Sequence, residues 1–249
     1  MKRLEVIPVG GVREVKEGMD LGEMVLDSLA RSKITLRDRD VVVVKQKVVS
    51  KAEGRVVAIS KVRPSSRALK LAKEHGKDPR LVELVLRESV RVVRAGHGVI
   101  VTETRHGFVC ANSGVDQSNV GPGLAALLPL DPDRSARRIR RRLEEKTGKE
   151  LAVVITDTFG RPWRRGQTDV AIGCSGITPI TSLRGKADPY GYELRVTEPA
   201  VADEIAGAAE LVAGKLSRVP VAVVRGATYQ RGPEGAGSIV MDRKRDLFR

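Results

Sequence analysis

The sequence predicts an α+β fold built from short buried strands and capped helices. Apolar runs at 41–44 and 151–155 are rich in β-branched residues and too short for helices, which is typical of buried strands. Longer segments at 21–32, 132–147 and 199–215 begin with capping residues or proline and have helical composition. Both kinds of element occur along the whole chain.

The composition is that of a globular protein. The 249 residues suffice for one large domain or two modest ones, and 31% charged with 41% hydrophobic residues argues against global disorder. No signal-peptide pattern opens the chain, and no apolar run approaches the ~18 residues of a membrane span. We therefore expect a soluble, cytoplasmic protein with no membrane partner.

The formal net charge of +14 predicts anionic partners such as nucleotides, nucleic acid or polyanionic metabolites. Only 3% of residues are aromatic, so stacking platforms for single strands are scarce. Cys110 and Cys174 lie far apart without a C-x-x-C motif, which predicts buried packing roles in a reduced compartment and disfavours zinc. The three histidines are scattered, and none receives a role.

The first part of the chain alternates strands and helices. Residues 4–9 alternate as a strand, and the glycines that follow favour a loop or short extended piece at 12–15. Asp20 is a suitable N-cap for the helix at 21–32. Four valines at 41–44 predict a strand that is buried on both faces.

Two helices and a hairpin are expected next. Serine and glycine delimit a helix at about 65–75, and an Asp-Pro pair starts a second helix that we expect to run over 79–93. Segments 96–102 and 107–111 predict the two strands of a hairpin.

The helix at 132–147 carries six arginines between 134 and 142, the densest basic stretch in the chain. A solvated helix face explains them, and contact with nucleic acid or another polyanion is the alternative. The helix at 199–215 precedes a last strand at 219–224, which leads into a glycine-rich segment at 225–238.

The segment 151–173 concentrates groups with chemistry. Its strand ends in Thr156-Asp157-Thr158, which places Asp157 at a strand's carboxyl end, where open sheets bind ligands. A carboxylate beside hydroxyls suits Mg²⁺ or Mn²⁺. A turn follows, with three arginines suited to phosphate: Arg161, Arg164 and Arg165. A capped turn with a solvated basic face would give the same pattern.

Other strand ends carry matching groups. Asp116 and Asn119 lie in a polar loop and suit a metal ion and a nucleotide, although an Asx-rich turn is the alternative. Lys51 follows the strand at 41–44, where a cation reaches either a ligand or solvent. The loop at 230–238 offers backbone N–H groups for phosphate without being a Walker A loop. Together these groups predict a metal-dependent enzyme acting on a nucleoside triphosphate or similar polyphosphate.

Five motifs make the prediction more specific: QKVVSKAEGR (46–55), NSGVDQSNV (112–120), ITDTFGRPWRRGQTDVAIG (155–173), DPYGYEL (188–194) and a terminal DLFR. In this order, over essentially the full length, they resemble the coenzyme F420:L-glutamate ligase family of archaeal deazaflavin biosynthesis. The chain length matches the archaeal form, without the nitroreductase-like domain of bacterial relatives.

The resemblance implies a family-specific α+β fold with mixed sheets and flanking helices, and a single ligase module over 1–249, with two structural lobes as an option. It implies an intertwined homodimer. The implied reaction transfers the GTP γ-phosphate to the phospholactyl carboxylate of F420-0, and L-glutamate then attacks the acyl phosphate. F420-1, and F420-2 after a second round, are the expected products. The implied cofactors are two divalent ions, Mg²⁺ or Mn²⁺, and a monovalent cation, K⁺.

By position in the matching motifs, Asp116 and Asp157 are assigned as catalytic residues that hold the first metal ion. Thr158 is assigned to the second ion, with Gln230 as its remaining ligand and Glu234 in reserve. The segments that match GTP contacts contain Val12, Arg13, Glu14, Val15, Gln46, Lys47, Lys51, Asn119, Thr228, Tyr229, Gln230, Arg231, Gly232, Pro233, Glu234 and Gly235.

Two rival functions are weighed against this one. A nucleic-acid-binding protein is motivated by the charge and the arginines at 134–142, and it would bind RNA or DNA with steep salt dependence whatever residue stands at Asp157. A different metal-dependent carboxylate–amine ligase would share the site and differ in its acceptor. We expect no nucleic acid among the partners, which are GTP, L-glutamate and F420-0.

Overall fold

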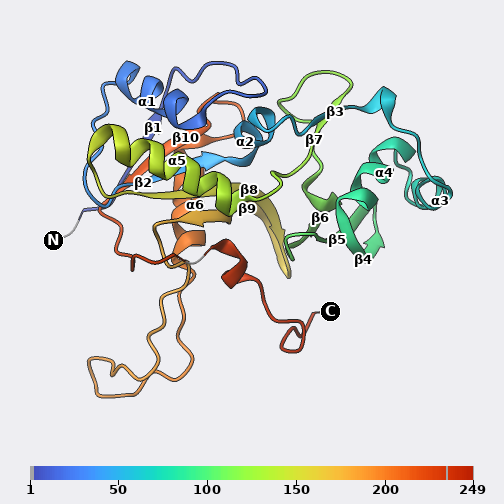
Figure 1. Ribbon diagram of the computed structural model, residues 1–249. Coiled ribbons are helices and arrows are strands. Elements are labelled where there is room, and N and C mark those ends of the chain that lie inside the picture. The colour runs from blue at the N-terminus through green and yellow to red at the C-terminus, as the bar shows by residue number, and fades with distance from the viewer. Residues whose placement is uncertain (1–2, 234, 249) are drawn as a thin grey trace.

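A five-stranded mixed sheet forms the centre of the structure, a computed structural model that describes residues 3–233 and 235–248 (Figure 1). Its strands lie in the order β1 (Glu5–Val9), β10 (Val221–Arg225), β2 (Val41–Lys45), β8 (Ala152–Arg161) and β9 (Arg164–Ser175). β2 and β8 are parallel, and each other neighbouring pair is antiparallel. The carboxyl end of β10 therefore lies at the opposite end of the sheet from the carboxyl end of β2.

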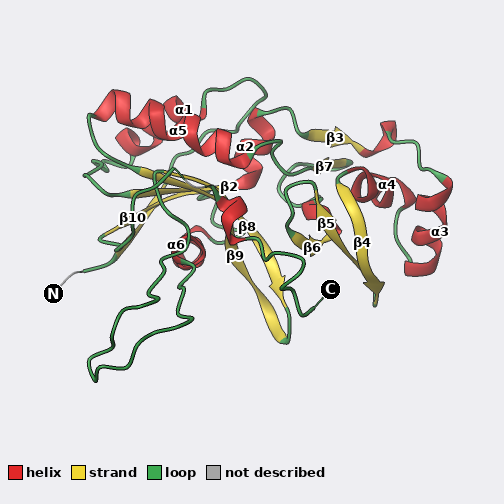
Figure 2. Cartoon of the chain, turned by 60° about the horizontal axis from the view of Figure 1, so that its bottom comes forward, coloured by secondary structure: helices red, strands yellow, loops and turns green. Residues whose placement is uncertain are grey.

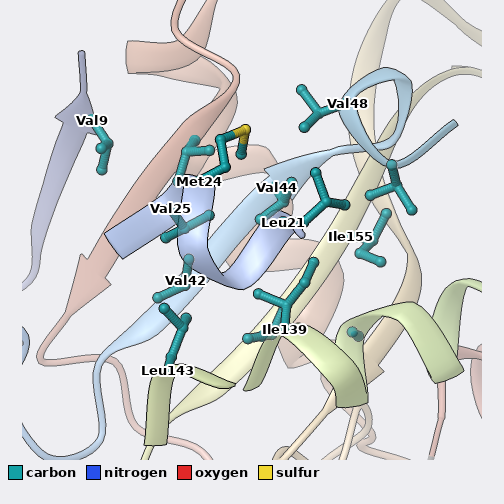
Figure 3. Close-up of a cluster of buried hydrophobic side chains, with 14 of the residues drawn as sticks. Val9, Leu21, Met24, Val25, Val42, Val44, Val48, Ile139, Leu143 and Ile155 are labelled. Carbon is teal, nitrogen blue, oxygen red and sulfur yellow. The ribbon is translucent and has the colours of Figure 1, made fainter. Parts of the chain in front are cut away.

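Helices cover both faces of this sheet (Figure 2). α1 (Leu21–Arg31) and α5 (Pro132–Thr147) pack on one face, and α6 (Val201–Ala213) packs on the other. Val42 and Val44 face the first layer, shown in Figure 3, and Val41 and Val43 face α6. The four valines are thus buried on both sides, as their uninterrupted run predicts.

A smaller lobe lies beside the sheet. It contains α3 (Ser66–His75), α4 (Pro79–Arg87), a three-stranded antiparallel sheet and a two-stranded one. The three strands are β4 (Ser89–Gly96), β5 (Val99–Thr104) and β6 (Val109–Ala111), and the pair is β3 (Val56–Ala58) and β7 (Leu124–Ala126). α2 (Gln46–Ala52) follows β2 directly and leads into this lobe.

Local capping signals place several helices correctly. The side chains of Asp20, Asp78 and Asp131 accept hydrogen bonds from the first turns of α1, α4 and α5. The expected helix at 79–93 is wrong beyond Arg87, because Val92 pairs with Thr102 in the β4–β5 hairpin. Cross-strand hydrogen bonds there outweigh the apolar spacing that suggested a longer helix. No helix of the described residues is long and apolar enough to span a membrane.

The strand expected at 151–155 is also longer than its apolar run. β8 continues to Arg161 because it pairs along its length with β9, so Asp157 lies inside the strand and not at its end. Its parallel neighbour β2 ends with Lys45 opposite Thr156. Asp157 is therefore the first β8 residue beyond the shared sheet edge, where the β8–β9 hairpin extends alone.

Candidate active site

A cavity of about 750 Å³ opens at this edge of the sheet, between the two lobes. Its walls come from the end of β2 and α2, from residues 110–119, from β8 beyond the sheet edge, and from the loops at 12–15 and 214–220. The carboxyl end of β2 and the part of β8 next to it thus meet at the cavity, at the sheet edge that open sheets commonly use for ligands.

α2 brings three polar residues to the cavity. Lys47 and Lys51 are one helical turn apart and share a face. Lys47 Nζ donates to Asp116 Oδ2 at 2.5 Å, and Lys51 Nζ donates to Glu14 Oε1 at 2.5 Å. Both ammonium groups are therefore held in the walls of the cavity by carboxylates from other segments.

Gln46, the first residue of α2, has a buried amide with an unused donor. The residue is 2% exposed, and its Oε1 accepts a hydrogen bond of 2.8 Å from Ser50. Within residues 3–233 and 235–248, Nε2 finds no hydrogen-bond partner. Buried donors are rarely left unsatisfied, so this amide suits a ligand's acceptor.

A left-handed turn positions Asp116. Asn112, Ser113 and Gly114 have φ values of 54°, 52° and 70°, an unusual run for non-glycine residues. Hydrogen bonds hold Ser113 there, because its amide and hydroxyl contact Thr102 Oγ1 at 2.9 and 2.7 Å. A Cβ at Gly114 would lie 2.6 Å from a Leu128 carbon, so the chain also needs glycine there.

Beyond the turn, backbone hydrogen bonds in both directions pair Asp116 with Ala126 of β7, at 3.0 and 2.8 Å. The backbone that carries the Asp116 carboxylate is therefore held rigidly. This rigidity fixes where its oxygens face the cavity.

Asp157 is half-buried on the other wall. Burial raises the pKa of Asp157 to about 7. The negative charges of Asp169 and Asp116 raise it further, whereas the hydrogen bond from the Thr158 N–H and the charge of Lys47 lower it. Cys110 lies near it as a buried free thiol, whose pKa burial and the Asp157 charge raise to about 12. The thiol is thus a packing residue.

Asp169 of β9 is a buried member of the site region that sequence patterns did not single out. It accepts hydrogen bonds of 2.8 Å from the hydroxyls of both Thr156 and Thr158, and Lys45 Nζ donates to it at 2.5 Å. Lys45 also contacts Glu210 of α6. The sequence could have indicated Asp169 only through its place opposite Thr158 in a hairpin. Finding that place requires the pairing register of β8 and β9.

Half of the predicted site residues meet at this cavity. Those that line it are Val12, Arg13, Glu14, Val15, Gln46, Lys47, Lys51, Asp116, Asn119, Asp157 and Thr158. Segments far apart in the sequence therefore converge as expected. Their individual roles remain predictions.

The loop at 228–235 does not join them within one chain, because β10 runs antiparallel to β2 and ends at the opposite edge of the sheet. There the Tyr229 carbonyl accepts from Arg39, and Arg231 pairs with Glu150. Gln230 is thus apart from Asp157, and Glu234 lies outside the described residues.

The segment before β10 borders the cavity instead, through Gly214, Lys215, Arg218, Val219 and Pro220. Its glycine and two basic residues, directly after a helix, are the signal that could have identified it.

The three arginines predicted to bind phosphate lie elsewhere. Arg161, Arg164 and Arg165 are exposed at the tip of the β8–β9 hairpin and do not line the cavity. The Arg161 guanidinium donates to the Arg165 carbonyl at 3.2 Å. These three side chains therefore lie outside the walls of the cavity.

The donor set fits a hard divalent cation. No three His, Cys, Asp or Glu side chains in the described part of the chain cluster as metal ligands. In the cavity, Asp116 and Asp157 would supply two carboxylate ligands and Thr158 a hydroxyl ligand. The remaining coordination positions of the ion would be filled by water or phosphate, as is usual for Mg²⁺. Burial is the main cause of the raised pKa of Asp157, with smaller contributions from the charges of Asp169 and Asp116, and a bound cation would favour the ionised form of this carboxylate.

Comparison with known proteins identifies the family of the chain. The family described as F420-0:Gamma-glutamyl ligase matches residues 11–226. The coenzyme F420:L-glutamate ligase of Methanothermobacter thermautotrophicus is 45% identical over 249 residues, 99% of both chains. The coenzyme F420:L-glutamate ligase of Methanopyrus kandleri is 45% identical over 99% of this chain and 98% of its own. That of Methanocaldococcus jannaschii is 42% identical over 92% of each chain. The chain belongs to the F420-0:gamma-glutamyl ligase family.

Proposed function

We propose that this protein uses GTP to join L-glutamate, by gamma linkage, to the phospholactyl carboxylate of F420-0. The observation that carries the proposal is the meeting of Asp116, Asp157, Lys47 and Lys51 in one cavity between the lobes. Carboxylates that suit a divalent ion and cations that suit phosphates are the set that phosphoryl transfer needs. The names of the three similar proteins give the acceptor and the amino acid.

Activation by phosphate explains why this site needs both signs of charge. A carboxylate does not react with an amine in water, so its oxygen first takes the GTP γ-phosphoryl group and GDP leaves. The glutamate amine then attacks the carbonyl carbon and phosphate departs. Lys47 and Lys51 would bind triphosphate oxygens, while Gln46 Nε2 donates to a GTP acceptor.

Divalent ions, Mg²⁺ or Mn²⁺, would be held by Asp116, Asp157 and Thr158. Bound there, they would offset the repulsion between the substrate carboxylate and the triphosphate. A monovalent cation, K⁺, and a second round of addition to give F420-2 belong to the same proposal. A cytoplasmic location is part of the proposal as well.

The proposal includes a homodimer. The loop at 180–200 projects away from the sheet (Figure 1) and exposes apolar side chains. Tyr190 is 97% exposed and Val196 80%, while Leu211 on the neighbouring α6 is 86% exposed. Exposed apolar groups gathered on a projecting arm suit burial against a second copy.

Mass spectrometry of F420-0 after incubation with the protein, GTP, Mn²⁺ and L-glutamate tests the function. We expect a GTP-dependent gain of one or two glutamyl units. Binding of GTP with no gain would point to a different acceptor for the same site. Failure of both would contradict the proposal.

A further inference from the structure

The carboxylate of Asp169 lies behind the cavity wall and not in it. The residue is 1% exposed and does not line the cavity, whereas Thr156 and Thr158 do. Its two oxygens divide the threonines: Oδ2 accepts from Thr156 Oγ1 and Oδ1 accepts from Thr158 Oγ1, each at 2.8 Å. Asp169 thus contacts the site only through other side chains.

An ionised carboxylate accepts hydrogen bonds and cannot donate them, while a hydroxyl has one proton and two lone pairs. The proton of Thr158 must therefore point at Asp169, which leaves the lone pairs of its oxygen directed elsewhere. We propose that Asp169 is a positioning residue that turns the Thr158 oxygen into an acceptor facing the cavity, where a divalent cation would use it. This inference rests on the proposed role of Thr158 as a cation ligand.

Lys45 completes the arrangement. Its ammonium contacts both Asp169 and Glu210, so it offsets the charge of the buried carboxylate and links the β8–β9 hairpin to α6. Lys45 is the last residue of β2, opposite Thr156, so the sheet fixes its backbone while the two carboxylates hold its ammonium. Partners of metal ligands commonly act in this way, by fixing the orientation of the ligand atom.

A double-mutant cycle on Mn²⁺ binding tests the proposal. Free Mn²⁺ is followed by electron paramagnetic resonance in titrations with and without GTP, using Asp169→Asn, Thr158→Val and the double variant. We expect Asp169→Asn and Thr158→Val each to weaken Mn²⁺ binding by about 10-fold. The double variant should bind Mn²⁺ as tightly as the single variant with the lower affinity. Thr158→Ser keeps the hydroxyl and should bind nearly as tightly as the wild type.

Asp203→Asn is the matched control. Asp203 also holds β9, because its Oδ1 accepts from the Ala171 amide at 2.8 Å, whereas the hydroxyls of Thr156 and Thr158 donate to Asp169. Its variant should bind Mn²⁺ as the wild type does. If Asp169→Asn fails to fold, Lys45→Met/Asp169→Asn removes the buried ion pair as a unit and should show the same loss.

Losses that add in the double variant would overturn the proposal, because Asp169 would then act independently of Thr158. A loss in Asp169→Asn with none in Thr158→Val would overturn it too and make Asp169 a ligand itself. A wild type that binds no Mn²⁺ would remove this inference together with the proposed cation site. If the wild type transfers glutamate but the losses of Mn²⁺ binding in the two single variants add in the double variant, this inference alone fails and the proposed function stands.

Discussion

Lys47 Nζ lies 2.5 Å from Asp116 Oδ2 and joins the first turn of α2 to the polar loop after β6. Burial by itself would raise the pKa of Asp116, but the hydrogen bonds from Lys47 and Ser118 bring it below its ordinary value. Lys47 thus keeps the carboxylate charged at the border of the two lobes. A triphosphate that attracts Lys47 would release Asp116 for a cation.

Replacement of Lys47 by methionine should therefore remove two functions at once. We expect kcat/KM for GTP to fall by about 100-fold, since a phosphate contact and the partner of Asp116 are lost together. Lys47→Arg should recover part of the activity, because it keeps the charge but changes its geometry. Steady-state release of GDP measures both. Lys61→Met, an exposed change outside the cavity, is the control, and unchanged kinetics in Lys47→Met would contradict the assignment.

Asp116→Asn and Asp157→Asn should each abolish turnover while the protein stays folded. The raised pKa of Asp157 means that folding disfavours its ionised form, so at pH 8 the amide removes a penalty. We expect Asp157→Asn to melt at or above the wild-type temperature in EDTA and to lose the rise that Mn²⁺ gives the wild type. Differential scanning calorimetry with and without Mn²⁺ checks this. Full turnover in either variant would remove the metal assignment.

The elements that sequence predicted well depend on neighbours along the chain. Asp20 and Asp131 cap helices within three residues, and the valines of β2 are buried whatever strands pair with them. The convergence of Asp116 and Asp157 followed because both lie just beyond short apolar runs of the sequence. Local chemistry was sufficient in each case.

Strand direction and hairpin register were not local. Whether β10 is parallel or antiparallel to β2 decides at which end of the sheet the loop after β10 lies. That direction depends on pairing between residues far apart in the sequence, such as Val221 with Val44. Asp169 could be recognised as a partner of Thr158 only from the register of the hairpin, which pairs the two residues. Both require knowledge of long-range pairs, which composition and spacing do not contain.

Gly114→Ala should destabilise the turn before Asp116 more than an ordinary left-handed glycine would. Its φ is +70°, and the added Cβ would lie 2.6 Å from Leu128. We expect a loss of about 2–4 kcal/mol in the free energy of unfolding, from backbone strain and overpacking together. Gly98→Ala, with φ +73° and no atom within 4 Å, isolates the strain and should cost about 1 kcal/mol. Guanidinium unfolding compares the two, and equal losses would mean that Leu128 yields easily.

The projecting loop should carry the proposed dimer. Tyr190→Ser/Val196→Ser removes its most exposed apolar groups, so we expect a shift from dimer to monomer at low micromolar concentration. Light scattering after size-exclusion chromatography measures the mass. Leu69→Ser removes an exposed leucine of α3, on the other lobe, and should leave the mass unchanged. A wild-type monomer would contradict the proposal directly.

Glu83 should make the smaller lobe sensitive to acid. The carboxylate is 8% exposed and joins α4 to the start of α3, accepting from the Ser65 amide at 2.9 Å, the Ser65 hydroxyl at 2.6 Å and Arg87 at 2.8 Å. The Ser65 hydrogen bonds and the Arg87 contact lower its pKa to about 2. In the unfolded chain a glutamate titrates near pH ~4.3.

Because the folded pKa is the lower one, the ionised carboxylate favours folding above pH ~4.3, and this stabilisation is lost as the pH falls towards about 2. It is worth about 3 kcal/mol at neutral pH, because each unit of difference between the folded and unfolded pKa corresponds to about 1.4 kcal/mol. Glu83→Gln should thus lower the free energy of unfolding at pH 7 and leave it close to that of the wild type near pH 2.5, since protonation has by then removed most of the difference. Urea unfolding across this range measures the two curves. Glu74→Gln, an exposed change on α3, should follow the wild-type curve throughout, and a constant gap between Glu83→Gln and the wild type would show that the contact does not depend on charge.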